Sequence, residues 1–519
     1  MNQPDGHSRI CLCLTCRTIQ EDLETYRRYA RFSDMAEIRA DFLLPEDMRR
    51  LDRVPSLLPV PLILTIRRAS DGGVYDGAES DRLELIRRAL AGGFAFVDLE
   101  EDLGQPPLER EARSRGTRVI RSFHESSGPD PGMEARIRGL KRHPTDLPKA
   151  AVRVDSTAEL CSLVDLYRRL EGWEKILVGM GPASLSLRIL ACSLGSYLTF
   201  SSAAKQQAAE GHTDPETLDT VYRARALSRS TRLFAIAGNP VLHSRSPRIH
   251  NTGFASLGMD AVYFPVQAES IEGFLRLAGT LGIRGASVTL PFKQAVIPHL
   301  ASVEVDVPRI GACNTLVRSR GGWHGANTDV SGFMEPLAAA SADADLSRLR
   351  ATVIGAGGAA RSAVYALRRT GCEVLVLNRT PARAEELAAE LGCRWAALDR
   401  RGLSAMAESS DIVVQTTSVG MSPDDRSDPV EGYAFQGHEI AYDIVYTPPM
   451  TRFLLRAKSA GCRIIQGGDM LLCQAMHQFR LFTGKEFPEA DRARLRTELV
   501  SSAGDATAGD ASADDATIV

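Results

Sequence analysis

A strand pattern that runs directly into a glycine-rich turn is the feature that most restricts what this chain can fold into. Residues 351–354 have the apolar character of a buried strand, and the turn after them reads Gly355-Ala356-Gly357-Gly358-Ala359-Ala360. A helix pattern at 362–367 and a second strand pattern at 373–377 follow. In this context the first glycine permits the tight turn, the second lets the backbone approach a pyrophosphate, and the helix N-terminus faces that anion. The order predicts a parallel βαβ unit that binds a dinucleotide.

The residues after the second strand indicate which dinucleotide. A site for NAD usually places Asp or Glu here, where the carboxylate accepts a hydrogen bond from the ribose 2′-hydroxyl. This chain has Asn378-Arg379-Thr380 instead. Arg379 can pair with a 2′-phosphate and its two neighbours can donate hydrogen bonds, so the sequence favours NADP over NAD. The alternative is that Arg379 is a solvated surface residue.

The first part of the chain alternates short apolar runs with amphipathic stretches. Eight runs read as strands, at 10–15, 36–41, 62–67, 94–99, 119–123, 150–154, 176–179 and 196–200, and helix patterns lie between them. Eight β/α repeats predict an N-terminal (β/α)₈ barrel. An open doubly wound sheet is the alternative, because strand number alone does not close a barrel.

The length of 519 residues suits two or three domains. The fold class expected is α/β: a barrel over 1–228, then a two-lobed half. Its first lobe covers 229–335 and is completed by 465–488, and its second, a Rossmann lobe that binds NADP, covers 336–464. A polar segment at 213–232 is expected to be helical. Residues 489–519 are expected to form a disordered acidic tail, to which no function is assigned.

Charge and cysteine content exclude several classes of protein. The formal charge of -3 and pI near 6.4 give no electrostatic reason to expect nucleic acid or an anionic membrane. Without an apolar run of about 20 residues or a targeting segment, a cytoplasmic location is expected. Cys11, Cys13 and Cys16 invite a metal hypothesis, but no fourth ligand follows at metal-binding spacing. Core packing is therefore expected for these thiols, and no metal.

Four polar motifs cluster between residues 238 and 330. They are Gly238-Asn239-Pro240-Val241-Leu242-His243-Ser244-Arg245-Ser246-Pro247, Ser287-Val288-Thr289-Leu290-Pro291-Phe292-Lys293, Gly311-Ala312-Cys313-Asn314-Thr315 and Gly325-Ala326-Asn327-Thr328-Asp329. Their hydroxyls and amides can bind hydroxyls or a carboxylate. Lys293 and Asp329 supply one proton-transfer or charge-stabilising pair. Taken separately, each motif also has a reading as turn and helix-cap chemistry.

Together these motifs strongly resemble the shikimate dehydrogenase family over about 229–485. The resemblance includes Asp443-Ile444-Val445-Tyr446-Thr447-Pro448, and Gly467-Gly468-Asp469-Met470 followed by Gln474. It implies reversible hydride transfer from NADPH to the ketone of 3-dehydroshikimate, which gives shikimate, with Lys293 and Asp329 as the catalytic pair. It also implies roles for further residues: Ser244 and Ser246 at the carboxylate, Thr289, Asn314, Asp329 and Gln474 at ring hydroxyls, Tyr446 lining the site, and Gly467 beside the cofactor.

Charged residues recur within the strand patterns of the first part. Glu37, Arg39 and Asp41 alternate with Ile38 and Ala40, so the three charges share one strand face. Three charges directed into a barrel make a site, because a packed core does not tolerate them unpaired. The alternative directs them to solvent and Ile38 inward.

Basic residues follow or enter other strand patterns of the barrel. Arg67 ends the third strand, His124 follows the fifth, and Arg188 lies beyond the seventh. Lys149 begins an otherwise apolar sixth strand, where a charged amine is expensive, so its pKa is expected to fall. A neutral amine suits attack on a ketone to form a Schiff base. The pKa range of His124 suits a general base that then acts as an acid.

These positions resemble type I 3-dehydroquinate dehydratase over about 9–225. The resemblance implies that Lys149 forms an imine with 3-dehydroquinate, that His124 moves the proton, and that Glu37, Arg39, Arg67 and Arg188 bind substrate. Two departures are visible. The Glu that steers the histidine in that family is Asp71 here. The closing-loop Ser-Ala-Pro-Gly-Gln is replaced by Ala208-Ala209-Glu210-Gly211-His212, in which His212 stands where the family has its substrate-binding Gln.

The reading that results is a bifunctional enzyme of the shikimate pathway that uses NADP and binds 3-dehydroquinate, 3-dehydroshikimate and shikimate. An NAD-dependent quinate/shikimate dehydrogenase with a weak or inactive barrel is the rival among enzymes. A ligand-sensing regulator on the same folds is the rival outside enzymes, although such a protein is expected to lose groups such as Lys149 and Lys293. The sequence does not fix the oligomeric state.

Overall fold

A computed structural model describes residues 8–203, 211–341, 344–408 and 410–501. By internal packing the chain divides into two compact units. The first holds the described residues of Met1–Phe254 and Gly258–Ile283, and the second holds those of Ala255–Leu257 and Arg284–Val519. These units cut across the segment 229–335, so the domain limits expected from the sequence stay predictions. Residues 208–210 of the predicted closing loop and residues 502–519 of the predicted tail lie outside the described residues.

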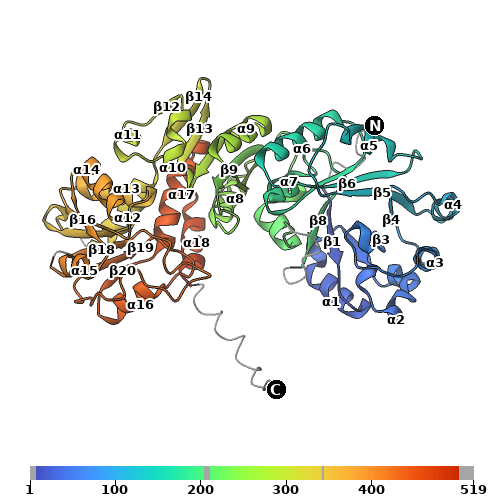
Figure 1. Ribbon diagram of the computed structural model, residues 1–519, viewed down its shortest axis with the longest axis horizontal. Helices are drawn as coiled ribbons and strands as arrows, with labels where there is room; N and C mark the ends of the chain where they lie inside the picture. The colour runs from blue at the N-terminus through green and yellow to red at the C-terminus, as the bar shows by residue number, and fades with distance from the viewer. Residues whose placement is uncertain (1–7, 204–210, 342–343, 409, 502–519) are drawn as a thin grey trace, which may run out of the picture. The chain divides into compact units, whose positions relative to one another are not determined.

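The first unit opens with an eight-stranded, all-parallel sheet, as the sequence predicted (Figure 1). The strands are β1 (Ile10–Leu14), β2 (Met35–Arg39), β3 (Leu62–Thr65), β4 (Phe96–Glu100), β5 (Arg118–Glu125), β6 (Leu147–Arg153), β7 (Ile176–Met180) and β8 (Thr199–Ser202). Each strand pairs with its neighbour along the chain, and β8 returns to pair with β1. Between β7 and β8 the Tyr197 N–H donates to the Lys175 carbonyl over 2.7 Å. This order is that of a barrel and excludes the doubly wound alternative.

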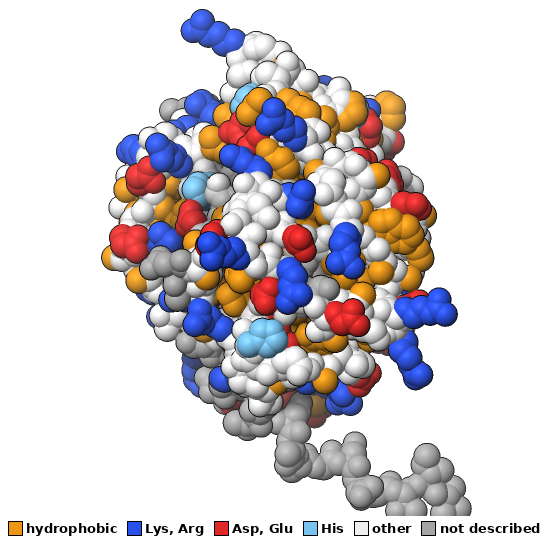
Figure 2. Space-filling view, turned by 90° about the vertical axis from the view of Figure 1, so that its left-hand side faces the viewer, with side chains coloured by type: hydrophobic (Ala, Val, Ile, Leu, Met, Phe, Trp, Pro, Cys, Tyr) orange, Lys and Arg blue, Asp and Glu red, His pale blue; other side chains and the backbone are white. Residues whose placement is uncertain are grey.

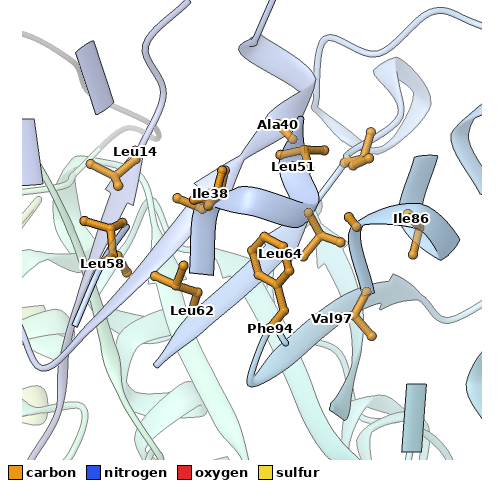
Figure 3. Packing of buried hydrophobic residues seen from close by; sticks show 14 of the residues in the cluster. Leu14, Ile38, Ala40, Leu51, Leu58, Leu62, Leu64, Ile86, Phe94 and Val97 are labelled. Atoms are coloured by element: carbon orange, nitrogen blue, oxygen red, sulfur yellow. The ribbon is translucent and has the colours of Figure 1, made fainter. Parts of the chain in front are cut away.

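Strand alternation separates two apolar layers in the barrel. The outward residues of β1 to β4 pack with the covering helices, and Figure 3 shows Leu14, Ile38, Leu62 and Val97 in this layer. The inward cluster contains Cys11 and Cys13, which confirms core packing for these thiols. The helices of the barrel are α1 (Ile19–Tyr29), α2 (Pro45–Met48), α3 (Glu79–Ala89), α4 (Pro106–Ser114), α5 (Met133–Gly139), α6 (Thr157–Arg169) and α7 (Leu185–Leu190).

The segment 213–232, expected to be one helix, contains only a π-helical turn at Thr217–Val221 and a 3₁₀ turn at Ala224–Ala226. The Asp214 carboxylate accepts from the Thr217 N–H and hydroxyl and so caps the start of this short helical turn. The segment is interrupted at Arg223, whose φ of +53° no helix accommodates. The first unit continues with four elements that we call the β9–α9 segment: β9 (Arg232–Gly238), α8 (Ser246–Ser256), β10 (Ala261–Gln267) and α9 (Ile271–Leu281). Strands β9 and β10 pair in parallel.

The second unit begins with short strands and helices that carry three of the polar motifs. They are β11 (Gly285–Val288), α10 (Phe292–Ala295), β12 (Ser302–Val303), α11 (Val307–Ile310), β13 (Thr315–Ser319), β14 (Gly322–Ala326) and α12 (Asp329–Ser341). Strand β13 lies between β11 and β14 and is antiparallel to both. Because α12 begins directly after β14, the Asn327-Thr328-Asp329 motif occupies the strand-to-helix turn.

A six-stranded parallel sheet in the order β17-β16-β15-β18-β19-β20 follows. Its strands are β15 (Arg350–Ile354), β16 (Glu373–Asn378), β17 (Arg394–Ala397), β18 (Ile412–Gln415), β19 (Ile440–Asp443) and β20 (Arg463–Ile465), and its helices are α13 (Gly358–Arg369), α14 (Pro381–Leu391), α15 (Arg400–Ala407) and α16 (Arg452–Ser459). The strand order reverses between β15 and β18, which is where doubly wound sheets bind ligands. The predicted Rossmann lobe is confirmed.

On the face shown in Figure 2, acidic, basic and apolar side chains are interspersed.

Two helices end the described chain. Helix α17 (Gly467–Thr483) packs along α12 and reaches β13, as expected for a helix that returns to the first lobe. Helix α18 (Glu489–Ser501) occupies the start of the predicted disordered tail, so that prediction is wrong for 489–501. Leu495 and Leu499 are buried, and the Arg496 guanidinium pairs with Asp469 of α17 over 2.7 Å. These contacts stabilise a helix whose own sequence is strongly polar.

Asp443 at the end of β19 is a buried carboxylate, and burial raises its pKa to about 7. Since the folded state holds this proton and the unfolded state releases it near pH 4, stability falls as the pH rises from about 4 to 7. Asp443→Asn keeps an acceptor for the Val445 N–H, and its amide N–H₂ can donate to the Thr451 hydroxyl, which in the wild type donates to Asp443. We expect it to stabilise the protein at pH 8 by up to about 4 kcal/mol and to have little effect at pH 4.

Unfolding midpoints of both proteins at pH 5 and pH 8 measure this effect. Asp424→Asn, at an exposed position, is the matched control and should leave the pH dependence unchanged. An equal shift for Asp443→Asn at both pH values would mean that the titration of Asp443 is not its cause.

Candidate active sites in the two halves

The centre of the barrel holds a buried lysine between two carboxylates. Lys149 on β6 lies with its Nζ 2.7 Å from an oxygen of Asp98 on β4 and 3.6 Å from one of Glu37 on β2. Burial works to raise the pKa of Asp98, but Lys149 and Arg67 outweigh it and hold that pKa well below the usual value. Strand β6 is otherwise apolar, as expected, but the amine does not lie in apolar surroundings, because β4 and β2, which are not adjacent to β6, supply anions across the barrel.

Asp98 is a site residue that sequence reasoning missed. It alternates with the outward Val97 and Leu99 and shares the inward face of β4 with Phe96, so the same alternation that identified Glu37 could have found it. Glu37 itself accepts hydrogen bonds from the Thr65 hydroxyl over 2.8 Å and from the Cys13 thiol over 3.1 Å. Glu37 and Arg39 are buried on β2 and Glu37 faces Lys149, so the solvent-facing alternative is excluded for this strand.

His124 on β5 lies against the guanidinium of Arg67. The Arg67 Nη1 to His124 Nδ1 distance is 2.8 Å, and the Arg67 Nη2 to Asp98 oxygen distance is 3.0 Å. Burial lowers the pKa of His124 well below its usual value, and the positive charges of Arg67 and Lys149 lower it further. Because a guanidinium only donates, Nδ1 accepts, and the neutral imidazole carries its proton on Nε2.

A second buried cation at this site has polar atoms without a hydrogen bond. Arg188 on α7 is 1% exposed, and its Nε and Nη1 lack a hydrogen-bond partner among the described residues. Burial lowers the pKa of Arg188 to about 10. The Nδ1 of His212 is also buried and lacks a partner in the described part of the chain. Burial lowers the pKa of His212 well below normal, with Arg188 adding to the effect. A buried unpaired guanidinium indicates an anionic ligand.

Two predicted positions differ from their expected place. Asp41 does not lie on the strand, because β2 ends at Arg39 and a 3₁₀ turn follows. Its carboxylate forms a bidentate pair with Arg39 at 3.0 and 2.7 Å. Asp71 pairs with Arg68 over 2.7 Å and also accepts from Ser70, so its carboxylate is directed to these neighbours. Arg67, rather than Asp71, contacts the imidazole of His124.

The second unit brings the predicted catalytic pair together. Lys293 of α10 lies with its Nζ 2.6 Å from one oxygen of Asp329, the first residue of α12. The other oxygen of Asp329 accepts from the Asn314 amide over 2.7 Å. A carboxylate at a helix N-terminus is stabilised by the N–H groups of the first turn. Lys293 is 18% exposed in its side chain, so the amine remains open on one side.

The dinucleotide turn lies beside this pair. Gly355 has φ of +114°, and a Cβ there would lie 2.5 Å from the Thr416 hydroxyl, so this turn requires glycine. A Cβ at Gly357 would meet nothing within 4 Å, which leaves room for a phosphate to approach the backbone. A Cβ at Gly358 would lie 3.0 Å from Lys293 Cδ. The residues present therefore fit a dinucleotide, and the turn that would hold it lies beside Lys293.

The remaining predicted residues of this half are placed as follows. Gln474 is buried on α17 and approaches Gly332 of α12, where a Cβ would lie 2.5 Å from Gln474 Cβ. Thr289 follows β11 and is partly exposed, and so is Tyr446 after β19. Gln478 was missed: it bonds the Ser287 hydroxyl over 2.8 Å and the Thr315 hydroxyl over 3.1 Å.

In the first unit, Ser244 and Ser246 lie at the start of α8. The Ser244 hydroxyl accepts from the Ser246 N–H over 3.2 Å, as a helix cap does. At the end of β16, the Asn378 amide donates to the Thr380 carbonyl over 2.9 Å. Arg379 is exposed and forms no ion pair with any residue that the structure describes. Gly467 begins α17, where a Cβ would lie 2.4 Å from the Ile444 and Val445 carbonyls.

Within the described ranges, no group of three or more His, Cys, Asp or Glu side chains is arranged to hold a metal ion. None of the described helices is both long enough and apolar enough to cross a membrane.

Comparison with known proteins assigns the parts of the chain to families. The model of type I 3-dehydroquinase matches residues 10–229, that of the shikimate dehydrogenase substrate binding domain matches 236–316, and that of shikimate / quinate 5-dehydrogenase matches 337–423. The bifunctional 3-dehydroquinate dehydratase/shikimate dehydrogenase (chloroplastic) of Arabidopsis thaliana is 29% identical over 504 residues, which cover 92% of this chain and 83% of the relative.

Single-function relatives match the second half. Shikimate dehydrogenase (NADP(+)) of Moorella thermoacetica is 43% identical over 288 residues, which cover 53% of this chain and 97% of the relative. A solved structure of dehydroquinate dehydratase and shikimate dehydrogenase from S. pombe is 24% identical, with a TM-score of 0.43, and the match covers 96% of this chain and 99% of that one. The chain therefore belongs to the shikimate dehydrogenase family through its second half, and its first half is a type I 3-dehydroquinase domain.

Proposed function

We propose that the two halves catalyse consecutive reactions: the barrel removes water from 3-dehydroquinate, and the second half reduces the product, 3-dehydroshikimate, to shikimate with NADPH. The observation that carries this proposal is the presence of two complementary sites on one chain. One is a buried lysine amine beside a neutral histidine, and the other is the Lys293–Asp329 pair beside a dinucleotide turn. The names of the relatives of both halves support it.

In the barrel, the Lys149 amine attacks the substrate ketone. Asp98 and Glu37 hold and orient the Lys149 nitrogen, which attacks as the neutral amine after its proton has passed to solvent. The C=N bond forms as the ketone oxygen leaves as water. His124 then removes a proton next to the imine carbon and returns it to the departing hydroxyl, which releases the second water. Hydrolysis of the imine consumes one water and restores Lys149, so one water is lost overall.

The contact between Arg67 and His124 adds a condition to this mechanism. In the structure the Nδ1 lone pair of His124 accepts from Arg67. A histidine that removes a proton needs a free lone pair, so Arg67 must turn toward the substrate first. Binding and activation of the base are thereby coupled. The Nε and Nη1 of Arg188, which have no hydrogen-bond partner among the described residues, suit the substrate carboxylate. His212 lies close enough for the charge of Arg188 to lower its pKa.

In the second half, NADPH supplies the hydride when bound. The Lys293 ammonium donates to the ketone oxygen, stabilises the charge that develops there and delivers the proton that makes the new hydroxyl. Asp329 orients the amine and is itself oriented by Asn314. As the family resemblance implies, Ser244 and Ser246 bind the carboxylate, Thr289, Asn314 and Gln474 bind ring hydroxyls, and Tyr446 lines the site. Gly355 to Ala359 and Gly467 lie at the cofactor.

A coupled assay tests the proposal. The full chain receives 3-dehydroquinate and NADPH, and shikimate formation and NADPH loss are followed together. Absence of shikimate contradicts the bifunctional assignment, and 3-dehydroshikimate supplied directly then shows which half failed. Activity on quinate with NAD at least equal to that on shikimate with NADP would support the NAD-dependent alternative.

Arg379→Ala tests the cofactor assignment. If Arg379 pairs with the 2′-phosphate, its loss should raise the KM for NADPH roughly 10- to 100-fold, because a charge-assisted hydrogen bond contributes about 1.5–3 kcal/mol. The KM for NADH should not change. Arg394→Ala is the control, because Arg394 is an exposed arginine at the start of β17, whereas Arg379 lies near the other end of that strand. Equal effects on both cofactors would instead assign Arg379 to the solvated surface.

The expectations of a cytoplasmic location and of no nucleic-acid or membrane partner stay predictions. A regulatory role is disfavoured because each half has the groups that its proposed reaction needs, and within each half these groups contact one another.

A further inference from the structure

The barrel and the β9–α9 segment are joined by a contact between α6 and α9 (Figure 1). Thr157, the first residue of α6, is fully buried, and its backbone N–H donates to an oxygen of Glu269 over 3.0 Å. The Thr157 hydroxyl donates to the other oxygen of Glu269. The first N–H groups of a helix have no partner within the helix, so this carboxylate satisfies a buried donor of the barrel.

A glycine permits this close approach. A Cβ at Gly273 of α9 would lie 2.2 Å from the Thr157 hydroxyl and 2.8 Å from Glu269 Oε1. Thr157 is a short and fully buried side chain, so a Cβ this close to its hydroxyl must displace the contact between α6 and α9. Farther along the two helices, the Arg168 guanidinium donates to the Thr280 carbonyl. By contrast, a Cβ at Gly279 of the same helix would meet nothing within 4 Å.

The contact lies at the end of the barrel that carries the reacting groups. Helix α6 follows β6, which carries Lys149, and Val154 between them donates its N–H to the Met180 carbonyl at the end of β7 over 3.0 Å. The chain after β7 turns at Gly181 into a short 3₁₀ turn (Pro182–Ser184) and then into α7, which carries Arg188. Strand β10 of the β9–α9 segment packs against this 3₁₀ turn and against α7.

We infer that the β9–α9 segment, a part of the dehydrogenase half, is a positioning support for the substrate-binding arginine of the barrel. Glu269 and Gly273 fix the start of α6, β10 fixes α7, and together they hold Arg188 at the place where the substrate carboxylate binds. Glu269 and Gly273 are thus positioning residues for dehydration. This inference rests on the proposed function of the barrel, and it assigns the dehydrogenase half a part in the first reaction.

Gly273→Ala in the full chain tests the inference, with Gly279→Ala as the matched control. Both changes place Ala for Gly inside the same helix, so both have the same intrinsic helix preference. We expect Gly273→Ala to raise the KM for 3-dehydroquinate about 5- to 10-fold with kcat within about twofold, because carboxylate binding weakens while Lys149 and His124 stay in place. Gly279→Ala should match the wild type. The reduction of 3-dehydroshikimate reports independently on the fold of the dehydrogenase half.

Hydrogen exchange supplies a readout that does not depend on activity. The Thr157 amide should exchange about tenfold faster in Gly273→Ala, and in Glu269→Ala, which removes the acceptor, if Gly273→Ala does not fold. An unchanged KM with faster exchange overturns the positioning role, and unchanged exchange overturns the contact itself. A fall in kcat without a rise in KM would show that the contact between α6 and α9 positions Lys149 rather than Arg188, and this result also overturns the inference. If the wild type lacks dehydratase activity, the proposed function fails, whereas the exchange result still decides the contact.

Discussion

Lys149→Met is expected to lower the dehydration of 3-dehydroquinate by roughly three to four orders of magnitude, because no other described amine lies at the centre of the barrel to form the imine. Asp98 keeps its pair with Arg67, so the carboxylate does not become an isolated buried charge. The reduction of 3-dehydroshikimate by the same preparation should stay within about twofold of wild type, since its groups lie in the second half.

Borohydride trapping gives this prediction a covalent readout. Wild-type protein reduced in the presence of 3-dehydroquinate should gain an adduct that maps to Lys149, and Lys149→Met should gain none. Lys141→Met, a lysine outside the strands, is the control and should be trapped like wild type. An adduct on a different lysine, or full activity in Lys149→Met, contradicts the imine mechanism.

The second large effect is expected at the Lys293–Asp329 pair. Lys293→Met and Asp329→Asn should each lower kcat for reduction by about 10²- to 10⁴-fold, the range for loss of a general acid or of the group that orients it. The double variant should lose little more than the worse single variant, because the two groups are 2.6 Å apart and act as a unit.

Single and double variants are compared by steady-state kinetics with 3-dehydroshikimate and NADPH. Lys485→Met, outside the helices and strands, is the control, and dehydration by the barrel reports on the integrity of the protein. Losses that add fully in the double variant, or a raised KM with unchanged kcat, would show that the pair binds substrate without taking part in proton transfer.

Much of the fold was predictable because it depends on local pattern. Eight apolar runs gave the eight strands of the barrel, and the glycine turn gave the first βαβ unit of the Rossmann lobe. The sequence failed where a tertiary contact overrides local preference. Helix α18 has a polar sequence but is held by buried Leu495 and Leu499 against α17. The segment 213–232 is interrupted at Arg223, whose backbone adopts a φ of +53° that the residue type does not announce.

The candidate sites show the same division. Lys149, His124 and Arg188 could be found because each is a polar residue in or after an apolar strand. Asp98 was within reach of the same alternation, but its pairing with Lys149 and the contact of Arg67 with His124 were not, because they depend on which side chains meet inside the barrel and on where a long guanidinium points. Asp71 was expected at the imidazole from its place in a motif, yet it pairs with Arg68 three residues earlier, where the backbone turn brings it.

The sequence by itself determined the two-part organisation, the dinucleotide turn and the two lysines proposed to react, because these follow from periodicity and from residue chemistry along a short stretch. Only the tertiary structure decided that carboxylates surround Lys149, that Arg67 occupies the lone pair of His124, and that Glu269 satisfies the buried N–H of Thr157. Each of these pairs joins residues that are distant along the chain, and their interaction depends on distance and burial, which the fold alone fixes.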